Sequence, residues 1–202
     1  MSTTEVARHV GDSEAIEEHE ESLPLRYAGF WARFGAALVD GLVLAPVTIV
    51  SFWILAYSRE ASIGLALPLG AVGPAYRVIL HARHGQTVGK MAARIAVVRV
   101  SGAPIGWREA LLRSSVDMVF GTIASLSSLV ARAQLPEADW TKGWMEKLKL
   151  ILTLEPSWGD WAGYALTVWI WSEVVTMLFN RKRRALHDFI ARTVVVRVIA
   201  AN

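Results

Sequence analysis

The sequence predicts an all-α membrane protein with four transmembrane helices and a small cytoplasmic cap that contains two short paired strands. Of its 202 residues, 53% are hydrophobic and 19% are charged, which is more apolar than an ordinary soluble domain. Four apolar stretches approach the roughly 20 helical residues that cross a bilayer. They are residues 35–57, 62–80, 114–131 and 161–179.

Two of these stretches carry further signals. The second contains Pro68 and Pro74, which remove helix hydrogen bonds and therefore predict a kink. The third is the least apolar, because several serines and Asp117 interrupt it. Small and hydroxylated residues suit contacts between helices in lipid, so we expect this helix to pack against the others.

The basic residues predict the orientation in the membrane. Of the 21 Lys and Arg residues, sixteen lie before the first span, in the 77–113 loop or in the 181–197 tail. Positive charge marks the cytoplasmic side of short loops, so both termini are expected in the cytoplasm, with the chain in the cell (inner) membrane. The five on the other side are Arg59, Arg132, Lys142, Lys147 and Lys149.

The domain organisation follows from charge and hydropathy. Residues 1–26 hold seven acids and two bases, a balance of −5, and few apolar side chains, which predicts a disordered acidic cytoplasmic tail. This segment also lacks the apolar core of a cleaved signal peptide. We expect one membrane domain over residues 27–198 and a short C-terminal end over residues 199–202.

The segment between the third and fourth spans, residues 132–160, is rich in tryptophan. Trp140, Trp144 and Trp158 are typical of anchors at a membrane interface. Residues 144–154 are mostly apolar with Lys147 and Lys149 opposite, which predicts a helix lying flat on the outer leaflet. A soluble ligand-binding loop is the alternative.

An internal repeat predicts the strands of the cap. The octapeptides at residues 93–100 and 191–198 agree at six of eight positions, and each follows a pair of predicted spans. Either a duplicated unit or chance similarity explains the match. Both segments are rich in β-branched residues, and a lone strand leaves its backbone groups unpaired. We therefore expect residues 95–100 and 193–198 to be extended and adjacent.

Three stretches carry a resemblance to a known family: YAGFWARFGAALVDGL, HGQTVGKMAARIAVVRVSGAPIGWREALLR and RKRRALHDFIARTVVV. Over residues 27–198 the chain resembles the RDD family, named for an arginine at the start of its first membrane helix and two aspartates. Arg33 and Asp40 match two of these positions, and the second aspartate is Asp188 or Asp117. The resemblance implies a membrane protein; some members look like cation/proton antiporters and others like assembly or quality-control components.

Charged residues inside the spans are the candidate site. Burying such a residue in a membrane helix costs about 2.5–3.5 kcal/mol, so a charge kept there has a role. Arg33 and Asp40 are about 10.5 Å apart along one helix, and Arg33 leans toward the helix N-terminus, away from Asp40, so no direct bridge is expected. We expect Arg33 to contact Asp188. The candidate network comprises Arg33, Asp40, Arg113, Asp117, Glu173 and Asp188.

Within this network, we expect Arg113 to pair with Asp40. Arg113 and Asp117, which are four residues apart on one helix, can also meet directly. The acids lie in the cytoplasmic half of the spans, whereas transport sites usually lie near the midplane. Two hypotheses follow. The protein is either a small cation/proton transporter that uses Asp40, Asp117 and Glu173, or a non-catalytic scaffold or assembly factor of a membrane complex.

Other chemistry has little support in the sequence. Cysteine is absent, and no combination of serine, histidine and aspartate has a local signature, so no enzyme is expected. GQTVGK lacks the spacing of a phosphate-binding loop, so no nucleotide cofactor is expected. His81, His84 and His187 suggest a metal site only weakly, because they lie in basic segments at the membrane edge.

The expected partners are lipids and membrane proteins. A basic run directly after the fourth span predicts a contact with anionic lipid headgroups of the bilayer. A homo-oligomer or a membrane-protein partner is also compatible with the sequence, whereas nucleic acid is not expected so close to the membrane. The basic run is Arg181, Lys182, Arg183 and Arg184.

Overall fold

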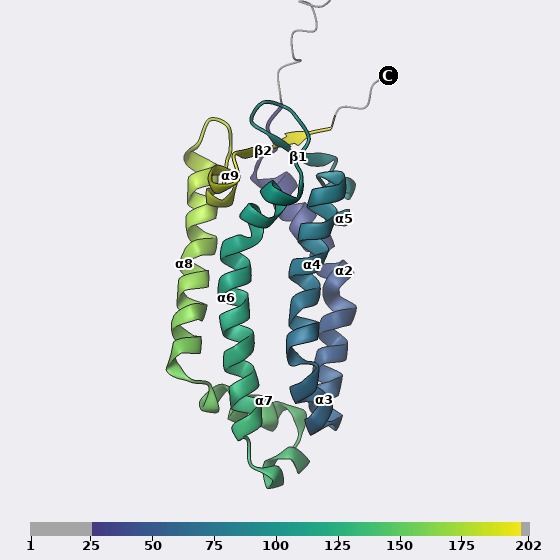
Figure 1. Ribbon diagram of the computed structural model, residues 1–202, viewed down its shortest axis with the longest axis vertical. Helices are drawn as coiled ribbons and strands as arrows, with labels where there is room; N and C mark the ends of the chain where they lie inside the picture. Colours follow the sequence, from purple (N-terminus) through teal and green to yellow (C-terminus); the bar gives the residue numbers. More distant parts are fainter. Residues whose placement is uncertain (1–25, 199–202) are drawn as a thin grey trace, which may run out of the picture.

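The structure is a computed structural model that describes residues 26–198. Four long helical segments run side by side, joined at one end by a unit containing a two-stranded sheet and at the other by the shorter helix α7, Trp144–Leu154 (Figure 1). The predicted acidic tail, except Arg26, and the C-terminal end lie outside the described residues. We call the end with the sheet the cap end, and the other the α7 end.

The four predicted spans are confirmed as helices long and apolar enough to cross a membrane. They are α2 (Phe30–Tyr57), α3 with α4 (Arg59–Gly64 and Ala66–His84), α6 (Trp107–Gln134) and α8 (Ser157–Phe179). Their most apolar windows are only 6–17% buried, so most of this apolar surface faces outward, as lipid requires. All four begin before the predicted bounds, and the second and third also end after them.

The second span is interrupted between α3 and α4. The break falls at Leu65, and Pro68 lies in the first turn of α4. A proline in a continuous helix would clash with the carbonyl four residues earlier, here that of Gly64, which explains a break just before it. Pro74 lies inside α4 and does not end it. Of the two prolines, only Pro68 therefore lies beside an interruption of the helix.

The cap end is built on the predicted strand pair. Strands β1 (Ile95–Arg99) and β2 (Thr193–Arg197) are antiparallel, with Val97 opposite Val195. The prediction that the two repeats are extended and adjacent is confirmed, although both strands end one residue earlier than expected. On the other edge of β2, the Ala28 N–H donates to the Val195 carbonyl at 2.8 Å. The chain entering α2 therefore extends the sheet.

The two repeats also share the structure around the strands. Each strand follows a five-residue helix, α5 (Val88–Ala92) before β1 and α9 (Leu186–Ile190) before β2. In each repeat the arginine before the strand has a left-handed backbone, with φ of 51° at Arg94 and 54° at Arg192. This conformation is uncommon outside glycine. Its recurrence at matching positions favours duplication over chance similarity.

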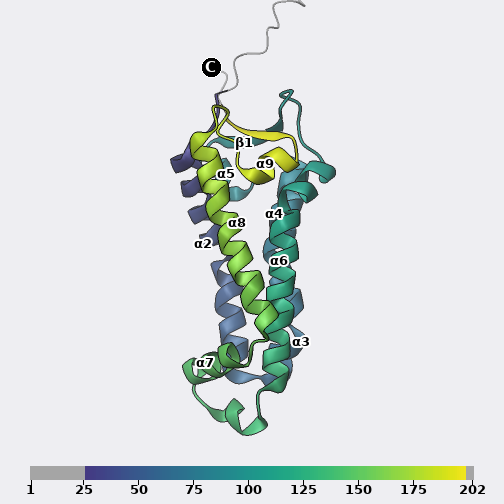
Figure 2. The same cartoon turned by 90° about the vertical axis from the view of Figure 1, so that its left-hand side faces the viewer.

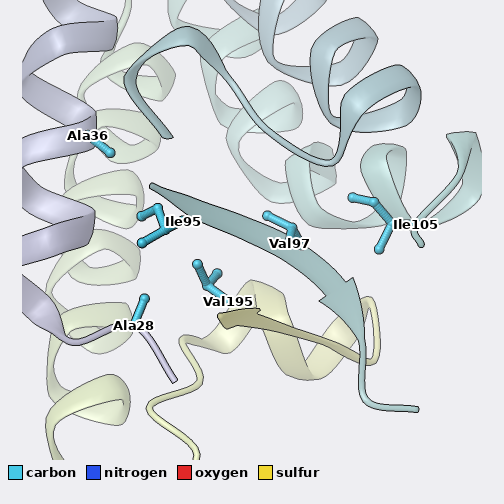
Figure 3. Packing of buried hydrophobic residues seen from close by; sticks show 6 residues of the cluster. All are labelled: Ala28, Ala36, Ile95, Val97, Ile105 and Val195. Atoms are coloured by element: carbon cyan, nitrogen blue, oxygen red, sulfur yellow. The ribbon is translucent and has the colours of Figure 1, made fainter. Parts of the chain in front are cut away.

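The cap, which comprises residues 26–28, α5, β1, α9 and β2, is fastened to α2 by an apolar cluster. Residues from α2 and from both strands meet with the loop before α6, as Figure 3 shows. All are at most 7% exposed, so the cluster is the core of this end of the molecule. It contains Ala28, Ala36, Ile95, Val97, Ile105 and Val195.

At the α7 end, helix α7 forms where it was predicted, but the two lysines expected on its polar face are not both exposed. Lys149 is exposed, whereas Lys147 is only 2% exposed and packs inward beside Ile151. Its ammonium donates to the carbonyl of Ala56 at 2.5 Å and lies 5.8 Å from the ring centre of Trp140. A cation at the C-terminus of α2 satisfies free carbonyls, which explains why this lysine is buried.

We expect Lys147→Met to lower the free energy of unfolding by about 1–3 kcal/mol, because the variant keeps the apolar stem but leaves the Ala56 carbonyl without its donor. Thermal unfolding of the purified protein in detergent measures the effect. Lys149→Met is the matched control, since this lysine on the same helix is exposed. Equal stability of the two variants would show that Lys147 does not hold α7 on α2.

Candidate functional site

Asp188 in α9 is the centre of a buried ionic network. It is fully buried, and its carboxylate accepts hydrogen bonds from Arg33 Nη1 at 2.8 Å, from Arg113 Nη1, and from the Ala185 N–H at 3.0 Å. Burial alone raises the pKa of Asp188, but the guanidiniums of Arg113 and Arg33 outweigh it and hold that pKa below its ordinary value. Asp188 therefore stays ionised and joins α2 to α6.

The predicted contact between Arg33 and Asp188 is confirmed. Arg33 also donates to the carbonyl of Arg183 at 2.7 Å, so it ties the start of α2 to the chain after α8. The expected pairing of Arg113 with Asp40 is wrong, because Arg113 is held by Asp188 and by the hydroxyl of Thr193 at 2.5 Å. The order of the segments along the chain did not show that α9 lies in space between α2 and α6.

Asp40 is bound by neutral donors instead. Its carboxylate accepts hydrogen bonds from the Tyr76 hydroxyl at 2.7 Å, the Thr87 hydroxyl at 2.6 Å and the Gly89 N–H at 2.8 Å. The last two groups belong to the start of α5, where a carboxylate suits the free N–H groups and the helix dipole. Asp40 therefore fastens α5 to α2.

Glycine at position 89 makes this contact possible. A Cβ at Gly89 would lie 2.0 Å from the Ala36 carbonyl oxygen and 2.8 Å from Cγ of Asp40. Any side chain would force α5 away from α2. The sequence contained this signal as the second glycine of GQTVGK, but its role depends on the packing of two segments that are far apart in the chain.

Glu173 in α8 is linked to the network through His187. One ring nitrogen of His187, Nδ1, contacts the Glu173 carboxylate, and the other, Nε2, lies 2.9 Å from Nη2 of Arg113. Because a guanidinium can only donate, Nε2 must accept, which assigns the proton to Nδ1 and a neutral ring. His187 therefore donates to Glu173, and a hydrogen-bonded chain runs from Glu173 to Asp188.

Lys90 in α5 also belongs to the site, although no motif in the sequence pointed to it. Its ammonium lies 2.6 Å from Nε2 of His81, and burial is the main cause that lowers the pKa of Lys90 to about 7. Arg113 and Arg33 lower it further, against the opposite effect of Asp188 and Asp40. Burial therefore favours the neutral amine of Lys90 more than water does.

Asp117 in α6 occupies a more open position than the other acids. It pairs with Arg77 of α4 at 3.3 Å, and the two side chains are 32% and 46% exposed. The second expected pairing, between Arg113 and Asp117, is not formed, since Arg113 turns toward α9. Asp117 thus has one cationic partner, whereas Asp188 has two.

One cavity of about 490 Å³ connects these groups, and we call it the cap-side cavity. Its apolar wall comes from α2 and α8, which approach each other near the cap while α8 crosses obliquely toward α6 (Figure 2). The three acids predicted as transport ligands all line it. Its charged and titratable lining residues are Arg33, Asp40, Arg77, Lys90, Arg113, Asp117, Glu173 and His187.

The basic run after α8 is divided between two roles. Arg181, Lys182 and Arg183 are exposed, and their contact with anionic headgroups stays a prediction. Arg184 turns inward instead: it donates to the Asp188 carbonyl at 2.9 Å and to the Thr193 carbonyl at 3.1 Å. Its guanidinium therefore holds α9 and β2, and its contact with anionic headgroups also stays a prediction.

No group of three or more potential metal ligands was found within residues 26–198. His81 and His187 have different partners there, Lys90 and Glu173.

The fold and the site together define a membrane-type protein of four apolar helices, tied to a small cap by buried arginine–aspartate pairs. The family model of the RDD family matches residues 27–192, and the chain belongs to this family. The pairing of Arg33 with Asp188 favours Asp188 over Asp117 as the second aspartate of the motif. Searches of curated proteins and of solved structures gave no match.

Proposed function

We propose that this RDD family protein is a small cation/proton transporter of the cell membrane, in which Asp117 and Glu173 take up and release protons. The observation that carries the proposal is the cap-side cavity, which both acids line. A transport site must reach water and change its protonation without unfolding the protein. Asp117 is partly exposed with a single cationic partner, and Glu173 has a neutral histidine as its donor, so both meet this requirement.

The other two acids fit a structural role better. Asp40 accepts three hydrogen bonds and holds α5, and Asp188 is fully buried between two arginines. Protonating either one would remove fastenings of the cap. This observation favours the scaffold alternative for Asp40 and Asp188. The predicted site therefore contains two structural acids, and Asp117 and Glu173 are the two transport acids.

We expect Glu173→Gln and Asp117→Asn each to abolish cation-driven proton movement, while the folded yield stays close to that of the parent. The measurement is the internal pH of proteoliposomes after a sodium or potassium gradient is applied. Asp160→Asn is the control, because Asp160 is an exposed acid at the α7 end. Unchanged exchange in both cavity variants would overturn the assignment of these acids, and no exchange in the parent would favour the scaffold.

The orientation is part of the proposal, with the cap in the cytoplasm. The chain lacks cysteine, so single introduced cysteines report accessibility without background. A cysteine at Ser157, which is exposed at the start of α8, should react with an impermeant reagent added to intact cells. Cysteines at Ser2 and Ala201 should react only after the membrane is opened. The opposite pattern would reverse the orientation.

A further inference from the structure

A second cavity lies between the helices at the α7 end, and we call it the α7-side cavity. Its volume is about 410 Å³, and its walls come mainly from α2, α3, α4 and α6. Hydroxyl groups and one guanidinium give it a polar lining, and none of its lining residues within the described part of the chain carries a carboxylate. The polar side chains are those of Thr48, Ser51, Ser62, Ser125, Ser128 and Arg132.

The lining contains buried polar atoms that need a partner. Ser62 is 2% exposed, and its Oγ has no hydrogen-bond partner among the residues that the structure describes. Arg132 donates through Nη1 to the Ser62 carbonyl at 3.0 Å, while its buried Nε is without a partner in the same part of the chain. Leaving such buried groups without a hydrogen bond is unfavourable, and bound water removes this penalty.

The two cavities come closest along α2, and we call the part of the molecule that separates them there the barrier. On α4 and α6 their nearest lining residues are seven positions apart. On α2, Leu44 lines the cap-side cavity, and Val47, three residues later, lines the α7-side cavity. Three helical residues correspond to about 4.5 Å along the axis. Leu44 reaches toward Gly73 of α4, where a Cβ would lie 3.8 Å from its Cδ1. A single leucine side chain therefore stands between the cavities on this helix.

Both helices contain a proline at this level. Pro46 lies within α2, two residues after Leu44, and Pro74 directly follows Gly73 in α4. An internal proline removes one helix hydrogen bond, so a helix bends there more easily than elsewhere. The barrier thus lies beside two positions at which a helix hydrogen bond is missing.

We propose that the α7-side cavity is a water-filled half-channel that continues the transport path from the cap-side cavity, closed by Leu44 against Gly73. This inference rests on the proposed function and adds the route from the other side of the membrane. Hydroxyl oxygens suit water, protons and a hydrated monovalent cation, whereas a divalent cation would need carboxylate ligands that this lining lacks.

Single cysteines test whether the cavity contains water. In the cysteine-free protein, the Ser62→Cys and Ser128→Cys variants should react with a small impermeant sulfonate reagent added on the α7 side. Thr122→Cys is the control, because Thr122 is exposed on α6 and does not line the cavity. Reaction of the two cavity variants with a lipid-soluble maleimide alone would overturn the proposal, since lipid would then fill the cavity.

The barrier is tested by shortening Leu44. Leu44→Ala should raise the passive proton leak of proteoliposomes several-fold, whereas Leu42→Ala, a residue 74% exposed on the same helix, should not. Equal leaks in the two variants would contradict the closure by Leu44. Sulfonate labelling without any cation-driven proton movement in the parent would contradict the proposed transport function but leave the water-filled cavity standing.

Discussion

Replacing Asp188 by alanine is expected to lower the free energy of unfolding by about 3–5 kcal/mol, the usual effect of leaving a buried charge without its partner. The variant leaves the guanidiniums of Arg33 and Arg113 beside an empty position, with side chains only 12% and 4% exposed. The N–H of Ala185 also loses its acceptor. Unfolding in detergent, followed by tryptophan fluorescence, measures the loss.

A double-mutant cycle with Arg33 tests whether the pair is coupled. Arg33→Ala should have the smaller single effect, because Asp188 would keep Arg113 as a partner. The double variant should lose less stability than the sum of the two single variants, since the second change then removes a charge that is already partly unpaired. Strict additivity would show that Arg33 and Asp188 do not interact. Asp160→Ala, at an exposed acid, should leave stability nearly unchanged.

Gly89→Ala is expected to separate α5 from α2. Its Cβ would lie 2.0 Å from the carbonyl oxygen of Ala36, a backbone atom that no side-chain rotation can move. Forcing one extra carbon into a tight contact costs about 1–3 kcal/mol, and here the hydrogen bond from Gly89 to Asp40 is lost as well. Reduced stability and faster proteolysis within residues 84–94 are the expected results.

Gly41→Ala is the matched control for this prediction. Gly41 lies one residue after Asp40 on α2, and a Cβ there would meet nothing within 4 Å. In a helix, alanine is more favourable than glycine by roughly 0.5–1 kcal/mol, so this variant should be as stable as the parent or more stable. If the two variants behaved alike, the close contact between α5 and α2 would have to be abandoned.

Hydropathy, residue type and spacing were enough to predict the elements that depend on neighbours along the chain. Hydropathy over windows of about 20 residues predicts the spans, because bilayer thickness sets their length. The β-branched octapeptides predicted β1 and β2, since two matching segments offered each other the missing hydrogen bonds. The axial distance between Arg33 and Asp40 excluded a bridge within α2 and left Asp188 as the partner of Arg33.

The partners of the remaining polar groups depend on contacts between segments that are far apart in the chain. Asp40 is held by Thr87 and Gly89, 47 and 49 residues later, because α5 folds back onto α2. Lys147 is buried for a similar reason, since α7 meets the end of α2 after a separation of 91 residues. A hydrogen bond depends on distance and angle, and neither can be read from spacing once several helices and loops intervene. The same limit hid both cavities, whose walls exist only where separate helices leave space between them.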